Sequence, residues 1–212
     1  MIKDNLEKIQ ERINQVNHTQ FVTLIAVSKT RSVDELQQAI NTGQKHFAEN
    51  YLQEALIKIN HLKGQNLIWH FIGPIQSNKT LKIAKNFDWV HSVDRLKIAK
   101  RLNEQRPKNL PNLKVLLQIN IDNEPIKSGA SIEQIDELVT HFESLKNLTL
   151  RGFMCIPNPS NSAQNFTRMT SIIKQYPNLD ALSMGMSRDL ESAITNGATF
   201  LRIGTDIFGK RA

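Results

Sequence analysis

Short apolar runs alternate with longer amphipathic segments along the whole chain, a pattern typical of repeated βα units. Several of the short runs are apolar almost throughout, as expected of parallel strands that are buried on both faces. The predicted strands span residues 21–27, 46–49, 68–73, 89–93, 114–121, 148–156, 181–185 and 200–204. Eight such units predict a closed parallel barrel. An open doubly wound sheet is the alternative, because periodicity alone does not distinguish the two.

The segments between the strands have apolar residues at helical spacing. The predicted helices span residues 33–43, 51–63, 77–86, 94–106, 131–146, 162–176 and 187–197. Ser32 and Glu35 have the spacing of a capping box, in which each side chain binds the other residue's backbone N–H. Asn50 with Gln53 has the same spacing, and Ser187 is expected to cap the last of these helices.

The eighth unit is incomplete, because only residues 205–212 follow its strand. The N-terminal segment has apolar residues at helical spacing, namely Ile2, Leu6, Ile9, Ile13 and Val16. We expect residues 1–18 to form a helix that packs near the closure of the barrel. The fold class is therefore α/β, a single (β/α)₈ barrel of the TIM type with an extra N-terminal helix, and residues 1–212 form one domain.

Composition places the chain among globular proteins, with 40% hydrophobic and 22% charged residues over 212 positions. No apolar run approaches the roughly 20 residues that span a bilayer, so no membrane partner is expected. The N-terminus has charges throughout and does not resemble a secretory signal. The one cysteine, Cys155, lies among apolar residues, which predicts a buried, inert thiol and a reducing compartment. We expect a cytoplasmic protein.

The net charge of +7 raises the question of nucleic acid. The basic residues are spread over helix-like segments, with no basic tail, zinc pattern or RNA-binding aromatic motif, so solvated helix faces are the favoured explanation and no nucleic-acid partner is expected. His70 and His91 lie within apolar strands and do not have the spacing of metal ligands. They are expected to be core histidines, and no metal site is predicted.

Polar and small residues gather where the predicted strands end, which is where barrels build their sites. Lys29 follows the first strand. A lysine that is partly removed from water loses its ammonium form more readily, and its amine can then form an imine with an aldehyde. The alternative is that Lys29 is an ordinary exposed lysine.

Residues suited to a phosphate follow the seventh and eighth strands: Ser183, Gly185, Ser187, Gly204 and Thr205. Glycine lets backbone N–H groups approach an anion closely, and a helix N-terminus attracts negative charge. An aldehyde that also has a phosphate would satisfy both ends of such a site. The alternatives are that Ser187 is only a helix cap and that Gly204 only marks a turn.

Several motifs in this order resemble the pyridoxal phosphate homeostasis protein family, a single-barrel relative of the alanine racemase N-terminal domain. They are AVSKT (26–30), FAENYLQE (47–54), HFIGPIQSNK (70–79), INIDNEPIKSG (119–129), GFMCIP (152–157), LSMGMSRDLESAI (182–194) and RIGTDIFGKR (202–211). The resemblance spans nearly the whole chain, and each motif falls at a predicted strand end.

The resemblance implies that the chain binds pyridoxal 5′-phosphate (PLP) as a Schiff base on Lys29. It implies that Ser183, Gly185, Ser187, Gly204 and Thr205 form the phosphate side of the site, with Asn50 near the ring. It places Arg202 at the pyridine nitrogen; the alternative is an ion pair of Arg202 with Asp206 or Glu49. It further implies a monomer involved in intracellular vitamin B6 homeostasis without catalysis, with apo forms of PLP-dependent enzymes as candidate acceptors.

Two enzymatic functions compete with this interpretation. A racemase or decarboxylase of the same barrel type would need a second base from another domain and subunit, and the chain ends about where the barrel ends, so no such domain is expected. A barrel enzyme that acts on a phosphosugar would need a carboxylate base at a strand end, for which Glu49 is the candidate.

Overall fold

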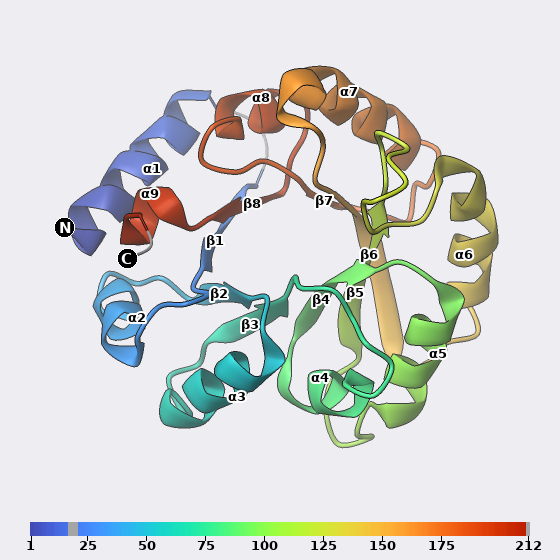
Figure 1. Ribbon diagram of the computed structural model, residues 1–212, viewed down its shortest axis with the longest axis horizontal. Coiled ribbons are helices and arrows are strands. Elements are labelled where there is room, and N and C mark those ends of the chain that lie inside the picture. Colours follow the sequence, from blue (N-terminus) through green and yellow to red (C-terminus); the bar gives the residue numbers. More distant parts are fainter. Residues whose placement is uncertain (17–20, 211–212) are drawn as a thin grey trace.

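The computed structural model describes residues 1–16 and 21–210, and within them eight parallel strands close into a barrel (Figure 1). Each strand pairs with its neighbours in sequence, and β8 pairs with β1. The strands are β1 (Thr23–Val27), β2 (His46–Glu49), β3 (Ile68–Phe71), β4 (Trp89–Val93), β5 (Leu113–Ile119), β6 (Leu148–Cys155), β7 (Ala181–Ser183) and β8 (Phe200–Ile203). The predicted barrel is confirmed and the open sheet is wrong.

Helices surround the barrel, one after each strand, as Figure 1 shows. They are α1 (Ile2–Val16), α2 (Val33–Ile40), α3 (Leu52–His61), α4 (Thr80–Asn86), α5 (Leu96–Gln105), α6 (Ile135–Phe142), α7 (Ser162–Ile173), α8 (Leu190–Thr195) and α9 (Thr205–Phe208), with 3₁₀ turns η1 (Ile132–Gln134) and η2 (Pro159–Asn161). Across the described ranges, none of them is long and apolar enough to cross a membrane.

The N-terminal helix α1 takes the place of the missing eighth helix. Among the described residues after β8, only the single turn α9 is helical, and α1 packs against α9, α8 and α2 (Figure 1). The Asn5 side chain donates a 2.9 Å hydrogen bond to the carbonyl of Ile207 in α9. The N-terminal helix therefore lies beside the elements that precede and follow β8 and beside the helix that follows β1. Residues 17 and 18 of the predicted helix lie outside the described residues.

One predicted capping box is confirmed and one is wrong. Ser32 and Glu35 bind each other's backbone N–H groups, at 3.2 and 2.8 Å. Asn50 does not cap α3, which begins one residue later than expected, with Tyr51 as its N-cap and no side-chain bond there. The backbone at Tyr51 is still extended, with φ −113° and ψ 112°, so the chain leaving β2 travels one residue further before it coils.

The predicted start of the helix after β7 is also wrong. Residues 187–189 form a turn and α8 begins at Leu190, with Asp189 in the N-cap position. The Asp189 carboxylate accepts a 2.7 Å hydrogen bond from the backbone N–H of Met186 and thereby closes this turn. Ser187 is left free of a capping role and lies in the loop between β7 and α8.

Two apolar layers hold the barrel together. Alternate residues of a strand point to opposite faces, so Ile25 and Val27 of β1 face one layer and Ala26 faces the other. The smaller layer fills the interior of the barrel and includes Ile25, Val27, Ala48, Trp89, Leu116, Met154, Ala181 and Phe200. The larger layer packs the helices onto the strands.

Cys155 lies at the end of β6, fully buried as predicted. Burial raises the pKa of its thiol to about 12, because the interior penalises the thiolate. The thiol therefore stays protonated and unreactive at neutral pH.

Candidate functional site

A cavity of about 330 Å³ opens at the carboxyl ends of the strands, the end at which barrels build their sites. Its volume lies within the roughly 300–1,000 Å³ that is typical of small-molecule sites. The lining residues are Val27, Lys29, Arg31, Asn50, Ile72, Met154, Ile156, Pro159, Met186, Ser187, Arg188, Asp189, Arg202, Gly204 and Thr205. Six residues singled out from the sequence meet there: Lys29, Asn50, Ser187, Arg202, Gly204 and Thr205.

Lys29 lies half-buried in the turn that ends β1. The next residue, Thr30, has φ +64°, a left-handed conformation that a β-branched residue rarely adopts and that costs about 1–3 kcal/mol. The Thr30 N–H donates a 2.5 Å hydrogen bond to the Glu54 carboxylate, which helps to hold this turn. A strained turn fixed in this way directs the chain sharply away after Lys29 and leaves the lysine at the cavity.

Asn50 follows β2, and its side-chain oxygen is a hydrogen-bond acceptor that is left unpaired. Its side-chain Oδ1 is buried and has no hydrogen-bond partner in the part of the chain that the structure describes. Leaving a buried acceptor unpaired costs about 1–3 kcal/mol, so the site favours a ligand or a water that supplies a donor. Because Asn50 also lines the cavity, this unpaired acceptor lies in the wall of the site.

The loops after β7 and β8 form one side of the cavity, with Ser187, Gly204 and Thr205. A Cβ atom at position 204 would lie 3.1 Å from the carbonyl of Val27, so glycine allows this close approach of the β8 end to β1. Arg31 and Arg188 add two cationic side chains to the lining. The sequence analysis missed both, although Arg31 follows Lys29 by two residues and Arg188 is adjacent to Ser187.

Ser183 and Gly185 do not line the cavity. Ser183 is fully buried and accepts a 2.7 Å hydrogen bond from Nη1 of Arg202. Gly185 has φ +90°, and a Cβ atom there would lie 2.5 Å from the Cβ of Ala193 in α8. Ser183 therefore contributes to the site through its hydrogen bond with Arg202. Gly185 contributes through the close packing of the β7–α8 loop against α8.

Arg202 is 5% exposed, and the alternative interpretation, an ion pair with Asp206 or Glu49, is wrong. Asp206 pairs with Arg12 at 3.2 Å, and Glu49 pairs with Lys58 at 2.8 Å. Arg202 instead donates to uncharged acceptors, Ser183 and the backbone. Burial lowers the pKa of its guanidinium, but an arginine remains charged at neutral pH. The cavity therefore has a buried, permanently positive donor in its wall.

Glu49 does not offer a base to the cavity. Its carboxylate is fully buried outside the cavity lining and accepts hydrogen bonds from Lys58 at 2.8 Å and from Ser28 at 2.6 Å. Burial raises the pKa of Glu49 from its ordinary value, although both partners act against this rise. This arrangement argues against the phosphosugar enzyme, which would need Glu49 at the mouth of the barrel.

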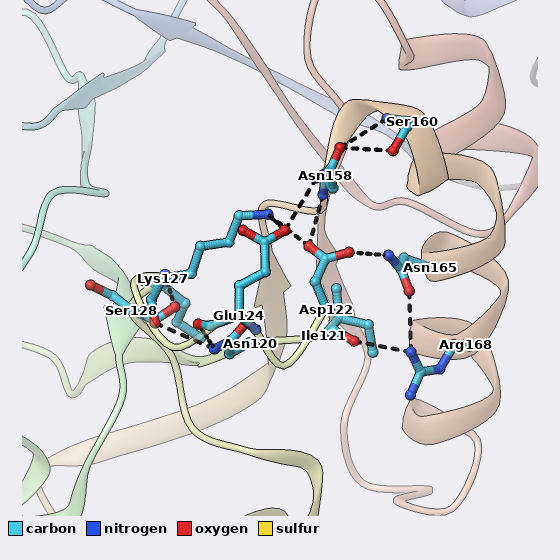
Figure 2. A network of polar contacts seen from close by, with 11 residues as sticks. Asn120, Ile121, Asp122, Glu124, Lys127, Ser128, Asn158, Ser160, Asn165 and Arg168 are labelled. Carbon is cyan, nitrogen blue, oxygen red and sulfur yellow. Dashed lines mark hydrogen bonds and ion pairs between the residues drawn. The ribbon is translucent and has the colours of Figure 1, made fainter.

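Lys127, in the loop after β5, is another lysine that could form an imine, and Figure 2 shows why its amine is a weak nucleophile. Its Nζ lies 2.8 Å from Oδ2 of Asp122 and 3.0 Å from Oε1 of Glu124. Burial would lower the pKa of Lys127, but the hydrogen bonds and charges of the two carboxylates raise it above its ordinary value. Asp122 is itself held by Asn158 and Asn165. Lys127 therefore keeps its proton. A second cavity, polar and of about 220 Å³, lies beside this network of contacts.

The two strand histidines are core residues, as predicted. His70 and His91 are fully buried, and Nδ1 of His70 lies 2.9 Å from Nε2 of His91. Within residues 1–16 and 21–210, no cluster of three or more His, Cys, Asp or Glu residues could hold a metal ion.

Comparisons with known proteins agree over the whole chain. Residues 1–212 match the family described as alanine racemase, N-terminal domain. The pyridoxal phosphate homeostasis protein of Pseudomonas aeruginosa is 49% identical over 220 residues, which cover 99% of this chain and 96% of that protein. The protein of the same name from Escherichia coli K12 is 44% identical over 226 residues, 99% and 97% of the two chains. The structure of PipY from Synechococcus elongatus with PLP bound superposes with a TM-score of 0.87 at 32% identity and covers 99% and 100% of the two chains.

Proposed function

The chain belongs to the family of pyridoxal phosphate homeostasis proteins, and on this basis we propose that it binds PLP in the strand-end cavity and serves PLP homeostasis as a carrier. One observation supports the proposal above the others. A single cavity of about 330 Å³ has a lysine at the end of β1 and a group of hydroxyl, glycine and arginine residues at the ends of β7 and β8. An aldehyde with a phosphate fits these two sides together.

In this proposal Lys29 forms a Schiff base with the PLP aldehyde. Ser187, Gly204 and Thr205 bind the phosphate, with Arg31 and Arg188 as nearby positive charges. Gly185 shapes this loop, and the unpaired Oδ1 of Asn50 lies near the ring, where it can accept a hydrogen bond. The absence of a side chain at Gly204 lets the end of β8 approach the carbonyl of Val27 closely, which keeps the two sides of the cavity together.

Arg202 is proposed to face the pyridine nitrogen, supported from behind by Ser183. Bound PLP supplies an electron sink whose strength depends on that nitrogen. A guanidinium can only donate a hydrogen bond, so it favours an unprotonated nitrogen and a weaker electron sink than a carboxylate partner does. This property supports a carrier over a racemase or a decarboxylase.

The experiment compares carrier and enzyme directly. The PLP-loaded protein is incubated with L-amino acids in deuterated water, and exchange at Cα is followed by NMR. We expect transfer of intact PLP to an added apo-enzyme without exchange at Cα. Exchange or racemisation at ordinary enzyme turnover, on the order of 1 s⁻¹ or faster, would overturn the carrier proposal and favour the enzyme.

The remaining parts of the proposal concern the state of the protein in the cell. We propose a cytoplasmic monomer that binds neither nucleic acid nor membrane and passes PLP to apo PLP-dependent enzymes. The mass in solution, measured by light scattering with and without PLP, tests the monomer. A dimer in both conditions would contradict it.

A further inference from the structure

Deepening the proposed PLP site, on which this inference rests, we propose that His91, His70 and His46 form a hydrogen-bonded chain of fixed direction that, through Ser183, positions Arg202. His91 is then a positioning residue for the cavity, although it does not line it.

The chain of contacts crosses the inside of the barrel from β2 to β8. Nδ1 of His46 lies 3.0 Å from Nε2 of His70, and Nδ1 of His70 lies 2.9 Å from Nε2 of His91. Nδ1 of His91 lies 2.8 Å from Oγ of Ser183, which in turn lies 2.7 Å from Nη1 of Arg202. His70, His91 and Ser183 are fully buried, so these contacts are shielded from bulk water.

The buried histidines are neutral. Burial holds the pKa of His70 and of His91 well below the usual range, and the charge of Arg202 adds to this effect at His91. A neutral imidazole has one donor nitrogen and one acceptor nitrogen. Each ring in the chain can therefore pass on only one direction of hydrogen bonding.

Arg202 sets that direction, because a guanidinium donates and never accepts. Ser183 Oγ therefore accepts from Arg202. The other polar contact of this hydroxyl in the described part of the chain is Nδ1 of His91, so we assign that nitrogen as the acceptor of the Ser183 hydrogen. With Nδ1 as acceptor, His91 has its hydrogen on Nε2 and donates to Nδ1 of His70. The same step repeats to His46. All three rings are then Nε2–H tautomers.

This direction gives Arg202 a fixed acceptor. Without His91 as its acceptor, the Ser183 side chain could rotate about its Cα–Cβ bond. Its Oγ would then leave the position at which it accepts the hydrogen bond from Nη1 of Arg202. The second anchor, a 2.9 Å hydrogen bond from Nη2 to the carbonyl of Cys155, would then hold the guanidinium alone. The histidine chain thus links the barrel interior to the placement of the guanidinium that we propose to face the pyridine nitrogen.

The direct test is the tautomeric state of the histidines in the protein without PLP. Long-range ¹H–¹⁵N NMR on protein labelled at its histidines distinguishes the two neutral tautomers and the charged ring. We expect the Nε2–H form for His46, His70 and His91 at neutral pH. A Nδ1–H form or a charged ring at His91 would overturn the proposal.

Two variants separate positioning from packing. His91→Asn places an amide oxygen near the position of Nδ1 and keeps an acceptor for Ser183, whereas His91→Phe keeps the ring and removes the acceptor. Both are expected to destabilise the fold, but only His91→Phe should weaken PLP binding, by about fivefold to tenfold. Equal PLP affinity in the two variants would contradict the positioning role. His61→Phe, at an exposed helix position, is the matched control and should leave PLP affinity unchanged.

Ser183→Ala provides a variant at which little else changes. It should weaken PLP binding like His91→Phe, and the double variant should be no weaker than either single one, because both act through Arg202. Full additivity would contradict the shared route. If the wild-type protein bound no PLP, the proposed function would be wrong. The histidine tautomers measured by NMR would then be the remaining test of the hydrogen-bonded histidine chain.

Discussion

Replacing Arg12 in α1 by glutamine should weaken the binding of PLP, although Arg12 does not line the cavity. Its Nε donates to Glu191 at 2.7 Å, Nη1 to Asp206 at 3.2 Å and Nη2 to the carbonyl of Ser187 at 3.2 Å. One side chain thus ties the N-terminal helix to α8, to α9 and to the loop that the proposal assigns to the phosphate. Without this side chain, the segments after β7 and after β8 lose a residue that contacts both of them in the phosphate side of the proposed site.

The expected loss is modest, because the Arg12 side chain is 34% exposed and its partners 45% and 36%. Exposed ion pairs contribute about 0.2–1 kcal/mol each, so two pairs suggest a total of about 1 kcal/mol. For a domain of this size that corresponds to a fall in Tm of about 2–4 °C. If the same free energy orders the loop, PLP affinity falls about fivefold, since about 1.4 kcal/mol corresponds to tenfold.

The assay compares PLP with pyridoxal, which lacks the phosphate. Arg12→Gln should lower the affinity for PLP more than the affinity for pyridoxal, so the ratio of the two falls. Arg151→Gln is the matched control, because it also breaks an exposed arginine–carboxylate pair, with Asp180, away from the cavity lining. It should lower Tm and leave the ratio unchanged. The reasoning is refuted if Arg12→Gln and Arg151→Gln give the same ratio.

The pH dependence of the Arg12 variant follows from Glu191. The hydrogen bond from Arg12 lowers the pKa of Glu191 below its ordinary value of 4.5, so the folded state favours the carboxylate. A lowered folded-state pKa stabilises the protein above the unfolded-state pKa and loses this contribution as the pH falls through the folded-state pKa. The difference in Tm between wild type and Arg12→Gln should therefore be larger at pH 7 than at about pH 4.

Three further predictions concern single sites and the surface charge. Ser187→Ala should weaken PLP binding about tenfold or more, because a charge-assisted hydrogen bond contributes roughly 1.5–3 kcal/mol; equal affinity of the wild type for pyridoxal and PLP would contradict a phosphate site. Cys155, whose pKa is raised to about 12, should resist alkylation in the folded protein and react only in denaturant, as mass spectrometry can show. Any association with DNA should disappear steeply as salt increases, and sequence-selective binding at physiological salt would oppose this account.

The barrel could be predicted from the sequence because its signal repeats. Each predicted strand run is found as a strand: β2 and β4 have the predicted bounds, whereas β3 and β7 end two residues earlier than predicted. The helix starts were less predictable. Asn50 and Ser187 have the side chains that caps favour, but the path of the backbone out of β2 and the turn at 187–189 decide the helix starts, and both depend on tertiary packing.

The site was predictable to the extent that it lies where strands end. Lys29 and Gly204 come from opposite ends of the chain and meet because the barrel closes β8 onto β1. Arg31 and Arg188 were not predicted, because nothing in a lone arginine near a strand end distinguishes a lining residue from a surface one. The hydrogen-bonded histidine chain could not be predicted from the sequence for a different reason. Its links join β2, β3, β4 and β7, and they depend on ring orientations that sequence spacing does not encode.

The central claim is that Lys29 holds PLP, and borohydride reduction followed by peptide mapping tests it most directly. The purified protein is loaded with PLP, reduced and digested, beside the variant Lys29→Ala. The variants Lys127→Ala and Lys79→Ala serve as controls, because they remove two other lysines in the segments after β5 and β3. We predict a stoichiometric phosphopyridoxyl group on Lys29 in all but the first variant, and loss of the imine absorption in Lys29→Ala with the fold intact by circular dichroism. An unchanged imine absorption in Lys29→Ala would contradict the account.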